Sequence, residues 1–403
     1  MKQWAFAAAL LLWATQASAV DHVAAGRYQA ILGDCEGCHT ALGGKPFAGG
    51  LILNTPFGKL AASNVTMDRQ TGIGSWSEAD FRRAMKEGIA PGGMRLYPAM
   101  PYPNYARMSD SDIAMLWAYM RTVAPVHHAV KVNLLPFPYN IRLGMVVWNW
   151  IDFRPRPFIP DSGKSAAWNR GAYLVTGAAH CGACHTPKTM LGADRTDRPL
   201  AGASLQGWFA PDITSNMTVG IGGWNASDIV AYLKTGWNAH AVASGPMAEA
   251  VENSTSRMTD PDLAAIAAYL KEVPASPRAS PAAPIAMSDP RMRAGAAAYE
   301  ANCTACHGGD GKGEGLLFPP LARNAVVQQD SAETLVRVVL AGARAAQTKE
   351  APTAPAMPSF AWRLNDQRVA DLLTYVRNAW GNAAAPVSAH AVTTIRARLR
   401  SGS

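Results

Sequence analysis

The sequence is poor in charged residues and in cysteine. Only 16% of its 403 residues are charged, whereas about 25% is usual for a globular protein. The 37 basic and 29 acidic residues are scattered, with no run of five Lys or Arg, so no nucleic-acid-binding patch is expected. Six cysteines are too few for a disulfide scaffold in a chain of this length.

Long apolar runs are also scarce. No stretch offers about 18 uninterrupted apolar residues, so the sequence predicts no membrane-spanning helix. The first 19 residues combine Lys2, an apolar run and the A-x-A sequence Ala17-Ser18-Ala19, which is typical of a secretory signal peptide. We therefore expect a periplasmic protein, soluble or held at the periplasmic face of the inner membrane by peripheral contacts.

The six cysteines fall in three pairs that share one pattern, C-x-x-C-H, which is the signature of covalent c-type haem attachment. Residues at i, i+3 and i+4 of a helix lie on one face. Two thioether bonds can therefore hold the porphyrin edge while the adjacent His reaches the iron. The predicted attachment residues are Cys35, Cys38, Cys181, Cys184, Cys303 and Cys306, and the predicted iron ligands are His39, His185 and His307. The sequence thus predicts three covalently bound haem c groups.

A single C-x-x-C could instead be a redox pair or half of a zinc site. Three copies, each followed by His and none with a leftover cysteine, argue against both alternatives. Zinc would also need further Cys or His at ligand spacing in each copy, and the sequence offers none.

The repeat extends beyond the haem motifs and predicts three homologous domains. Two helical patterns follow each motif. The first is predicted to begin after an N-cap at Ser77, Asn225 and Ser331 and to end at Gly88, Gly236 and Gly342. The second is predicted to begin after Ser109, Thr259 and Asn365. The expected fold is therefore mainly α, with three tandem cytochrome c-like haem domains.

The segments between the repeats complete the predicted organisation. In chain order we expect a signal peptide (1–19), a first domain (20–125), an aromatic and Pro-rich segment (126–165), a second domain (166–273), a linker (274–290), a third domain (291–381) and a basic tail (382–403). Segment 126–165 is too apolar for a free linker, and we expect it to pack between domains in preference to a membrane or quinone contact. For the tail, the default expectation is disorder.

Alignment of the three copies also selects a second axial ligand for each iron. The selected residues are Met100, Met247 and Met357, each in the loop between the two aligned helices. Met108 and Met258 align with Leu364 just before the second helix, where a hydrophobic staple explains them. His240 is the alternative ligand in the second domain, and His180, which precedes Cys181, is expected to be structural or exposed. Histidine–methionine ligation would raise the haem potential.

Each ligating His also needs an acceptor for its second ring N–H. Pro46, Pro199 and Pro320 each begin a Pro-x-Ala motif downstream of a haem site. A backbone carbonyl at or beside these prolines is one interpretation, and simple turn punctuation is the other.

With these motifs, the chain resembles the three-haem cytochrome c subunits of periplasmic membrane-associated dehydrogenases. The resemblance covers about residues 22–381, and it includes the segments Leu96–Tyr102, Leu135–Pro138, Trp168–Leu174, Gly207–Thr214 and Gly245–Glu249. It implies the haem ligands named above and no substrate-converting site of the chain's own. It also implies a partner, a quinoprotein, flavoprotein or molybdenum catalytic subunit, whose electrons pass to ubiquinone or a terminal oxidase.

Two other classes of function stay open on the sequence. One is a haem enzyme in its own right, such as a peroxidase, which needs an open iron position and acid–base groups beside it. Three matched methionines argue against that class. The other is a freestanding periplasmic electron carrier, which would never co-purify with a catalytic subunit.

Overall fold

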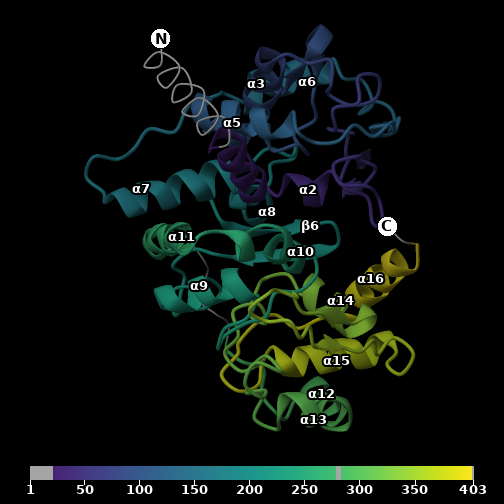
Figure 1. The fold of residues 1–403 in the computed structure, drawn as a ribbon. Coiled ribbons are helices and arrows are strands. Elements are labelled where there is room, and N and C mark those ends of the chain that lie inside the picture. Colours follow the sequence, from purple (N-terminus) through teal and green to yellow (C-terminus); the bar gives the residue numbers. More distant parts are fainter. Residues whose placement is uncertain (1–20, 278–282, 402–403) are drawn as a thin grey trace, which may run out of the picture. The chain divides into compact units, whose positions relative to one another are not determined.

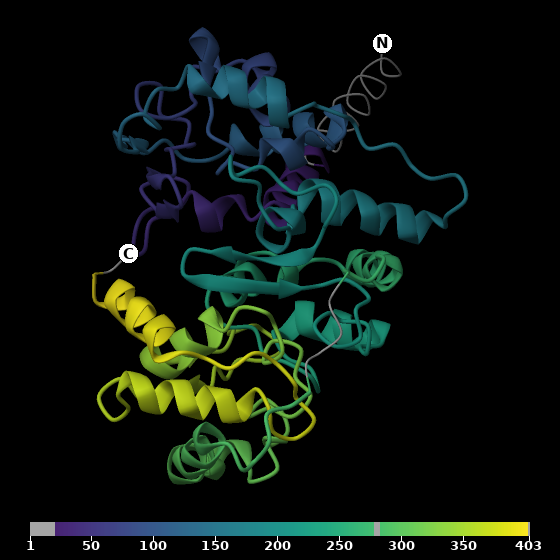
Figure 2. The same ribbon diagram turned by 180° about the vertical axis from the view of Figure 1, so that it is seen from behind.

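A computed structural model describes residues 21–277 and 283–401 (Figures 1 and 2). The expected signal peptide, 1–19, lies outside the described residues. The described chain divides into two compact units: the first runs to Pro160 and also takes Tyr173–His180, and the second takes Asp161–Ala172 and the chain from Cys181 onward. Each unit is described separately below.

The first unit contains one haem motif and two small antiparallel sheets. It opens on a helix over residues 21–32. The following elements are α2 (Cys35–Cys38), β1 (Ile52–Thr55), β2 (Gly58–Ala61), α3 (Glu78–Glu87), β3 (Ile89–Ala90), η1 (Pro91–Gly93), β4 (Met94–Arg95), α4 (Tyr102–Tyr105), α5 (Asp110–Met120), β5 (Asn133–Leu134), α6 (Gly144–Asp152) and the π-helical turn η2 (Leu174–Ala178). The strands pair in the orders β1-β2-β5 and β3-β4.

The second unit contains the other two haem motifs. Its elements are α7 (Ala166–Tyr173, whose last residue belongs to the first unit), α8 (Cys181–His185), β6 (Ala201–Leu205), β7 (Trp208–Asp212), α9 (Ala226–Thr235), α10 (Pro246–Asn253), η3 (Thr255–Arg257), α11 (Asp260–Glu272), α12 (Pro290–Asn302), α13 (Thr304–His307), α14 (Glu333–Ala341), β8 (Ala343–Arg344), β9 (Ala356–Met357), α15 (Asp366–Val376) and α16 (Ala389–Ser401). The strands form the hairpins β6-β7 and β8-β9. Helices dominate both units, as the sequence predicts.

Most of the predicted helix starts are confirmed. Ser77 and Asn225 each form a capping box, in which Asp80 and Asp228 return the hydrogen bond to the cap. The predicted caps of the second helices, Ser109, Thr259 and Asn365, each accept a backbone N–H of the first turn. The prediction for Ser331 is wrong by one residue, because α14 begins after Ala332; the Ser331 hydroxyl still accepts the Glu333 N–H at 3.2 Å.

In each repeat, the helix before the haem motif crosses the second aligned helix at a glycine. A Cβ added to Gly26 would lie 1.8 Å from the carbonyl oxygen of Met115. A Cβ added to Gly171 would lie 1.9 Å from the carbonyl oxygen of Ala265, and one added to Gly295 would lie 2.2 Å from that of Asp371. The two backbones therefore touch, and only glycine fits. The sequence analysis missed these positions, although a glycine stands shortly before every C-x-x-C-H.

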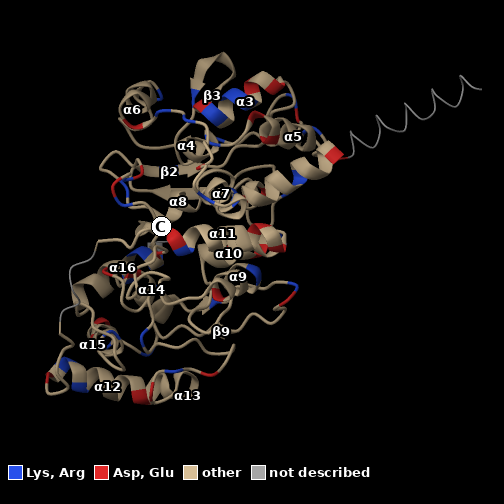
Figure 3. Ribbon diagram, turned by 90° about the vertical axis from the view of Figure 1, so that its left-hand side faces the viewer, with Lys and Arg blue, Asp and Glu red and all other residues tan. Residues whose placement is uncertain are grey.

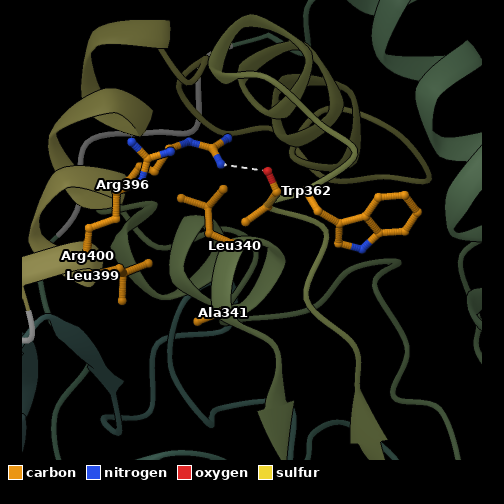
Figure 4. Close-up of a pocket in the computed structure, with 7 residues that line it drawn as sticks. Leu340, Ala341, Trp362, Arg396, Leu399 and Arg400 are labelled. Carbon is orange, nitrogen blue, oxygen red and sulfur yellow. Dashed lines mark hydrogen bonds between the residues drawn. The ribbon is translucent and has the colours of Figure 1, made fainter.

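The C-terminal tail is ordered in the structure, so the expectation of disorder is wrong for residues 389–401. Helix α16 packs on α14 and α15, and Val392 on α16 is fully buried in the core of the third repeat. Arg396 donates to the Asp366 carboxylate at 2.6 Å and to the carbonyl of Ala361 at 3.0 Å. Figure 4 shows Arg396, Leu399 and Arg400 of α16 beside Leu340 and Trp362, where they line a shallow surface cavity of about 380 Å³. Helix α16 docks because the face that carries Val392 is apolar, although arginines also lie along the helix.

Two further features bear on function. In the described part of the chain, Lys and Arg are scattered over the elements of both units (Figure 3). None of the helices in residues 21–277 and 283–401 is long and apolar enough to cross a membrane.

Candidate haem sites

The three C-x-x-C-H motifs lie on short helices, α2, α8 and α13. None of the six cysteines, all of them in the described chain, is in a disulfide. Burial raises the pKa of the Cys35 and Cys181 thiols to about 12 and that of Cys303 to about 11. A redox C-x-x-C pair needs a lowered thiol pKa. The described residues also contain no group of three His, Cys, Asp or Glu able to hold a metal ion. The raised thiol pKa values do not fit a redox C-x-x-C pair.

Each motif histidine is held by a backbone carbonyl. The Nδ1–H of His39 donates to Ser63 at 2.7 Å, that of His185 to Pro211 at 2.7 Å, and that of His307 to Pro319 at 3.1 Å. Because a carbonyl only accepts, the proton must be on Nδ1, and Nε2 keeps its lone pair for iron. Burial lowers the pKa of all three rings, so each is neutral, as a metal ligand must be. These residues fit covalently attached haem.

The predicted acceptors are confirmed in the third site only. Pro319 is next to Pro320, but Ser63 and Pro211 lie far from Pro46 and Pro199 in the sequence. In the first two repeats a hairpin, β1-β2 or β6-β7, follows the Pro-x-Ala motif, and the acceptor comes after the first hairpin or at the end of the second. The prediction fails in the first two sites because the inserted hairpin, which the third repeat lacks, places the acceptor carbonyl farther along the chain.

In those two repeats the Pro-x-Ala motif supports the acceptor indirectly. Phe47 has a positive φ of 61°, its amide donates to Thr40 beside His39, and its carbonyl accepts the Val65 N–H at 2.9 Å. Leu200 in the second repeat also has a positive φ of 61°. Its amide donates to the Thr186 hydroxyl beside His185, and its carbonyl accepts the Ile213 N–H at 2.9 Å. The middle residue of each motif is thus hydrogen-bonded both to the threonine that follows the haem-site histidine and to the residue two positions after the acceptor carbonyl.

The first predicted methionine ligand, Met100, is half-buried in a bend immediately before α4. Tyr102, at the start of α4, has no exposed surface. Tyr105, at the end of α4, donates its hydroxyl to the Gly33 carbonyl at 3.2 Å. A Cβ on Gly33 would lie 3.3 Å from the Sγ of Cys35. Helix α4 therefore connects the methionine segment to the attachment helix.

The second predicted methionine ligand, Met247, lies in the first turn of α10 and not in a loop. Met247 packs against a buried cluster formed by Ala243, Ala248, Val251 and Ala346. Just before it, Gly245 has a positive φ of 56°, and a Cβ there would lie 2.5 Å from the indole of Trp208. Trp208 begins β7, the strand whose Pro211 carbonyl holds His185. One strand therefore supports both the predicted methionine and the histidine.

The third predicted methionine ligand, Met357, lies on the short strand β9. Met357 and the attachment residue Cys303 both pack against the same buried core, which includes Tyr299, Leu340 and Leu373. The structure thus places the two ends of this predicted site on one core.

The rival ligands are engaged elsewhere. Met108 and Met258 are only 2% and 1% exposed, as expected of staple residues. His240 stacks on Trp224 with ring centroids 5.5 Å apart and directs Nε2 to Asp228 at 3.3 Å. His180 contacts Tyr105 edge to face, and its Nε2 donates to the Gly33 carbonyl at 3.1 Å. These contacts give both histidines structural roles.

The methionine segments of the second and third repeats are connected to each other. Ala343 of β8 pairs with Met357, and Ala345 forms a β-bridge to Ser244, just before Met247. Glu252, at the end of α10, accepts the Gln347 N–H at 2.7 Å and forms an ion pair with the Arg344 guanidinium at 2.8 Å. Both contacts lie inside the second unit, so the surroundings of two predicted sites form one hydrogen-bonded structure.

Three helical repeats with C-x-x-C-H on a short helix, and a histidine held from its Nδ1, define a protein of the cytochrome c class. The cytochrome c family model matches residues 23–124, 169–274 and 292–380. The chain therefore belongs to the cytochrome c family, and it is an electron-transfer protein with three covalently bound haem c groups.

Several of its relatives are cytochrome subunits of dehydrogenases. The gluconate 2-dehydrogenase cytochrome c subunit of Pantoea cypripedii is 39% identical over 92% of this chain and 88% of its own length. The cytochrome c subunit of the quinone-dependent alcohol dehydrogenase of Gluconobacter oxydans is 39% identical over 98% and 88%. The fructose dehydrogenase cytochrome subunit of Gluconobacter japonicus is 37% identical over 93% and 82%.

Proposed function

We propose that this chain is the electron-transfer subunit of a periplasmic dehydrogenase. It accepts electrons from a separate catalytic subunit and relays them through three haems to ubiquinone or a terminal oxidase. The observation that carries the proposal is the threefold recurrence of a histidine whose Nδ1–H is fixed by a backbone carbonyl, next to two cysteines. The names of the relatives support a dehydrogenase as the electron donor.

In this proposal the haem iron supplies the one-electron chemistry, and the chain controls its surroundings. His39, His185 and His307 would each bind one iron, and their carbonyl partners fix the ring orientation and tautomer. Met100, Met247 and Met357 would each provide the second protein ligand, which would favour a high potential and a closed iron site. A closed site suits electron transfer and disfavours reaction with peroxide.

The connected methionine segments support a relay inside the second unit. The bridge between Ser244 and Ala345 and the contacts of Glu252 hold the second and third repeats together beside Met247 and Met357. These contacts would hold the second and third haem sites in a fixed arrangement.

The haem content of the purified chain is the first test. A pyridine haemochrome assay is expected to give three haems c per chain, and fewer would refute the proposal. The ferric protein should also show the far-red charge-transfer band of methionine-ligated haem. Replacing Met100, Met247 or Met357 by Ala should each remove about one third of that band, because three similar sites contribute. Met190→Ala, which is 96% exposed, is the control and should leave the band unchanged.

The partner and the location are tested separately. The chain, tagged and isolated from its own cells, is expected to bring down a flavoprotein, quinoprotein or molybdenum subunit; a chain that always purifies alone would favour a freestanding carrier. N-terminal sequencing of the periplasmic fraction should begin after Ala19. Retention of residues 1–19 in the cytoplasm would contradict export.

A further inference from the structure

Helix α6 of the first unit exposes an apolar stripe. Its members and their exposed fractions are Leu143 (74%), Val146 (41%), Val147 (57%), Trp150 (78%) and Ile151 (51%). They lie at i, i+3, i+4, i+7 and i+8, so they form one continuous face of the helix. A helix in a soluble protein normally turns such a face toward the core, so an outward-facing one indicates an interaction surface.

The opposite face of α6 is fixed to the first unit. Asn149 accepts the hydroxyl of the fully buried Tyr102 at 2.7 Å. Trp148 and Phe153 pack edge to face on the same Tyr102 ring, with centroids 6.2 Å and 4.9 Å away, and both are less than 9% exposed. Met145 packs on the buried cluster of Leu60, Tyr97 and Leu135. The outward direction of the stripe is therefore set by the packing of α6.

The residues on either side of α6 in the chain include further exposed apolar side chains. Phe137 and Ile159 are each 79% exposed, and Tyr139 and Ile141 are about half exposed. The charged residues of segment 134–160 are Arg142, Arg154 and Arg156 against the single acid Asp152. Arg154 and Arg156 are exposed, while Arg142 lies over the Tyr97 ring, 4.9 Å from its centroid. The segment thus combines exposed aliphatic side chains, an exposed indole and an excess of positive charge.

We infer that this α6 surface, residues 137–159, is a membrane-contact site for a bilayer that contains anionic phospholipid. An interfacial helix buries its apolar face at the boundary of headgroups and acyl chains, with Trp at the headgroup level and basic residues near the phosphates. The stripe, Trp150 and the arginines supply these three features. The excess of arginine over acid sets the choice of occupant, because it complements a negative lipid surface.

The inference rests on the first unit alone and does not depend on the relay. It does place the methionine segment of the first haem site near the lipid, because Tyr102 joins α6 to the chain immediately after Met100.

Vesicle co-sedimentation tests the inference with the haem-loaded full chain. Vesicles of phosphatidylcholine with phosphatidylglycerol should bind the protein, and binding should weaken with salt and with pure phosphatidylcholine. The double variant Val147→Ser/Trp150→Ser should lower the partition coefficient by at least about tenfold, because it removes two side chains from the apolar contact. Arg154→Gln/Arg156→Gln should weaken binding to the anionic vesicles only.

The matched control is Trp362→Ser, since Trp362 is 79% exposed and Trp150 is 78% exposed, but Trp362 lies in the second unit. This control should bind vesicles like the wild type. Haem content and the far-red band check that every variant is folded. The inference is overturned if the wild type ignores anionic vesicles, or if the α6 variants bind them as well as the control does. Loss of a catalytic subunit by α6 variants that still bind vesicles would instead assign the surface to a protein partner.

Discussion

A single methyl group at Gly295 should separate the two helices that frame the third haem site. Gly295 lies on α12 where that helix crosses α15, and Cys303 directly follows α12. On an open helix, Gly→Ala stabilises by about 0.5–1 kcal/mol, because glycine loses more backbone freedom on folding. At Gly295 we expect the opposite sign.

The distances at the crossing decide the magnitude. The new Cβ would lie 2.2 Å from the Asp371 carbonyl oxygen and 2.6 Å from the Cβ of Tyr375. A carbon–oxygen contact needs about 3.3 Å, so the helices must move apart by about 1 Å. Overpacking of this kind costs about 1–3 kcal/mol. We expect Gly295→Ala to destabilise the helix pair by about 2 kcal/mol, a factor of about 30 in its opening equilibrium.

Hydrogen exchange of the peptides that cover α12 and α15 measures this opening directly. Gly144→Ala is the control, because Gly144 is also helical but has no atom within 4 Å of an added Cβ. That variant should be neutral or slightly more stable. Exchange in α12 and α15 that is unchanged or slower in Gly295→Ala would refute the argument from close packing, and the same reasoning would then fail at Gly26 and Gly171.

Three further outcomes are expected. Asp262→Asn weakens a bidentate ion pair with Arg170, whose two hydrogen bonds are both 2.8 Å long. The free energy of unfolding should fall by about 2 kcal/mol, less than for a fully buried pair because Arg170 is 35% exposed. Thermal unfolding measures this loss. Hydrogen bonds from the Thr393 hydroxyl and from Arg396 lower the pKa of the Asp366 carboxyl. The docking of α16 is therefore stabilised above the unfolded pKa of about 3.9 and weakens as the pH falls through the lower folded pKa. Hydrogen exchange in α16 that does not become faster below about pH 4 would contradict this. Glu252→Ala removes the acceptor of two donors in the third repeat and should destabilise the second unit by about 1–2 kcal/mol, with a weaker far-red band on mild heating.

Local patterns in the sequence predict much of the fold. Each cap residue accepts a hydrogen bond from a backbone N–H only three residues farther along the chain, so the sequence alone can predict it. These residues are Ser77, Asn225, Ser109, Thr259 and Asn365. The attachment motifs are equally local, and repetition strengthened each of them. The staple role of Met108 and Met258 followed from alignment of the repeats, and their burial confirms it.

Features that depend on distant chain segments were missed. The acceptors for His39 and His185 come after hairpins whose presence changes which carbonyl reaches the ring. The glycine crossings depend on the partner helix, which no local window contains. Helix α16 carries alternating arginines that favour solvent, but Val392 and the Arg396–Asp366 pair appear only once α14 and α15 are in place.

The path of the chain between the two units limits how this protein can be divided. The chain leaves the first unit at Pro160, returns to it for Tyr173–His180 and leaves again at Cys181. Tyr173 bonds to Ser109 and Asp112, and Asn104 donates to the Thr176 carbonyl, so the returning segment is part of the structure of the first unit. No single cut releases both units whole. A fragment that stops at Pro160 lacks this segment, and one that begins at Cys181 lacks the helix that carries Gly171. Haem-by-haem dissection is therefore better done by point substitution in the intact chain than by truncation.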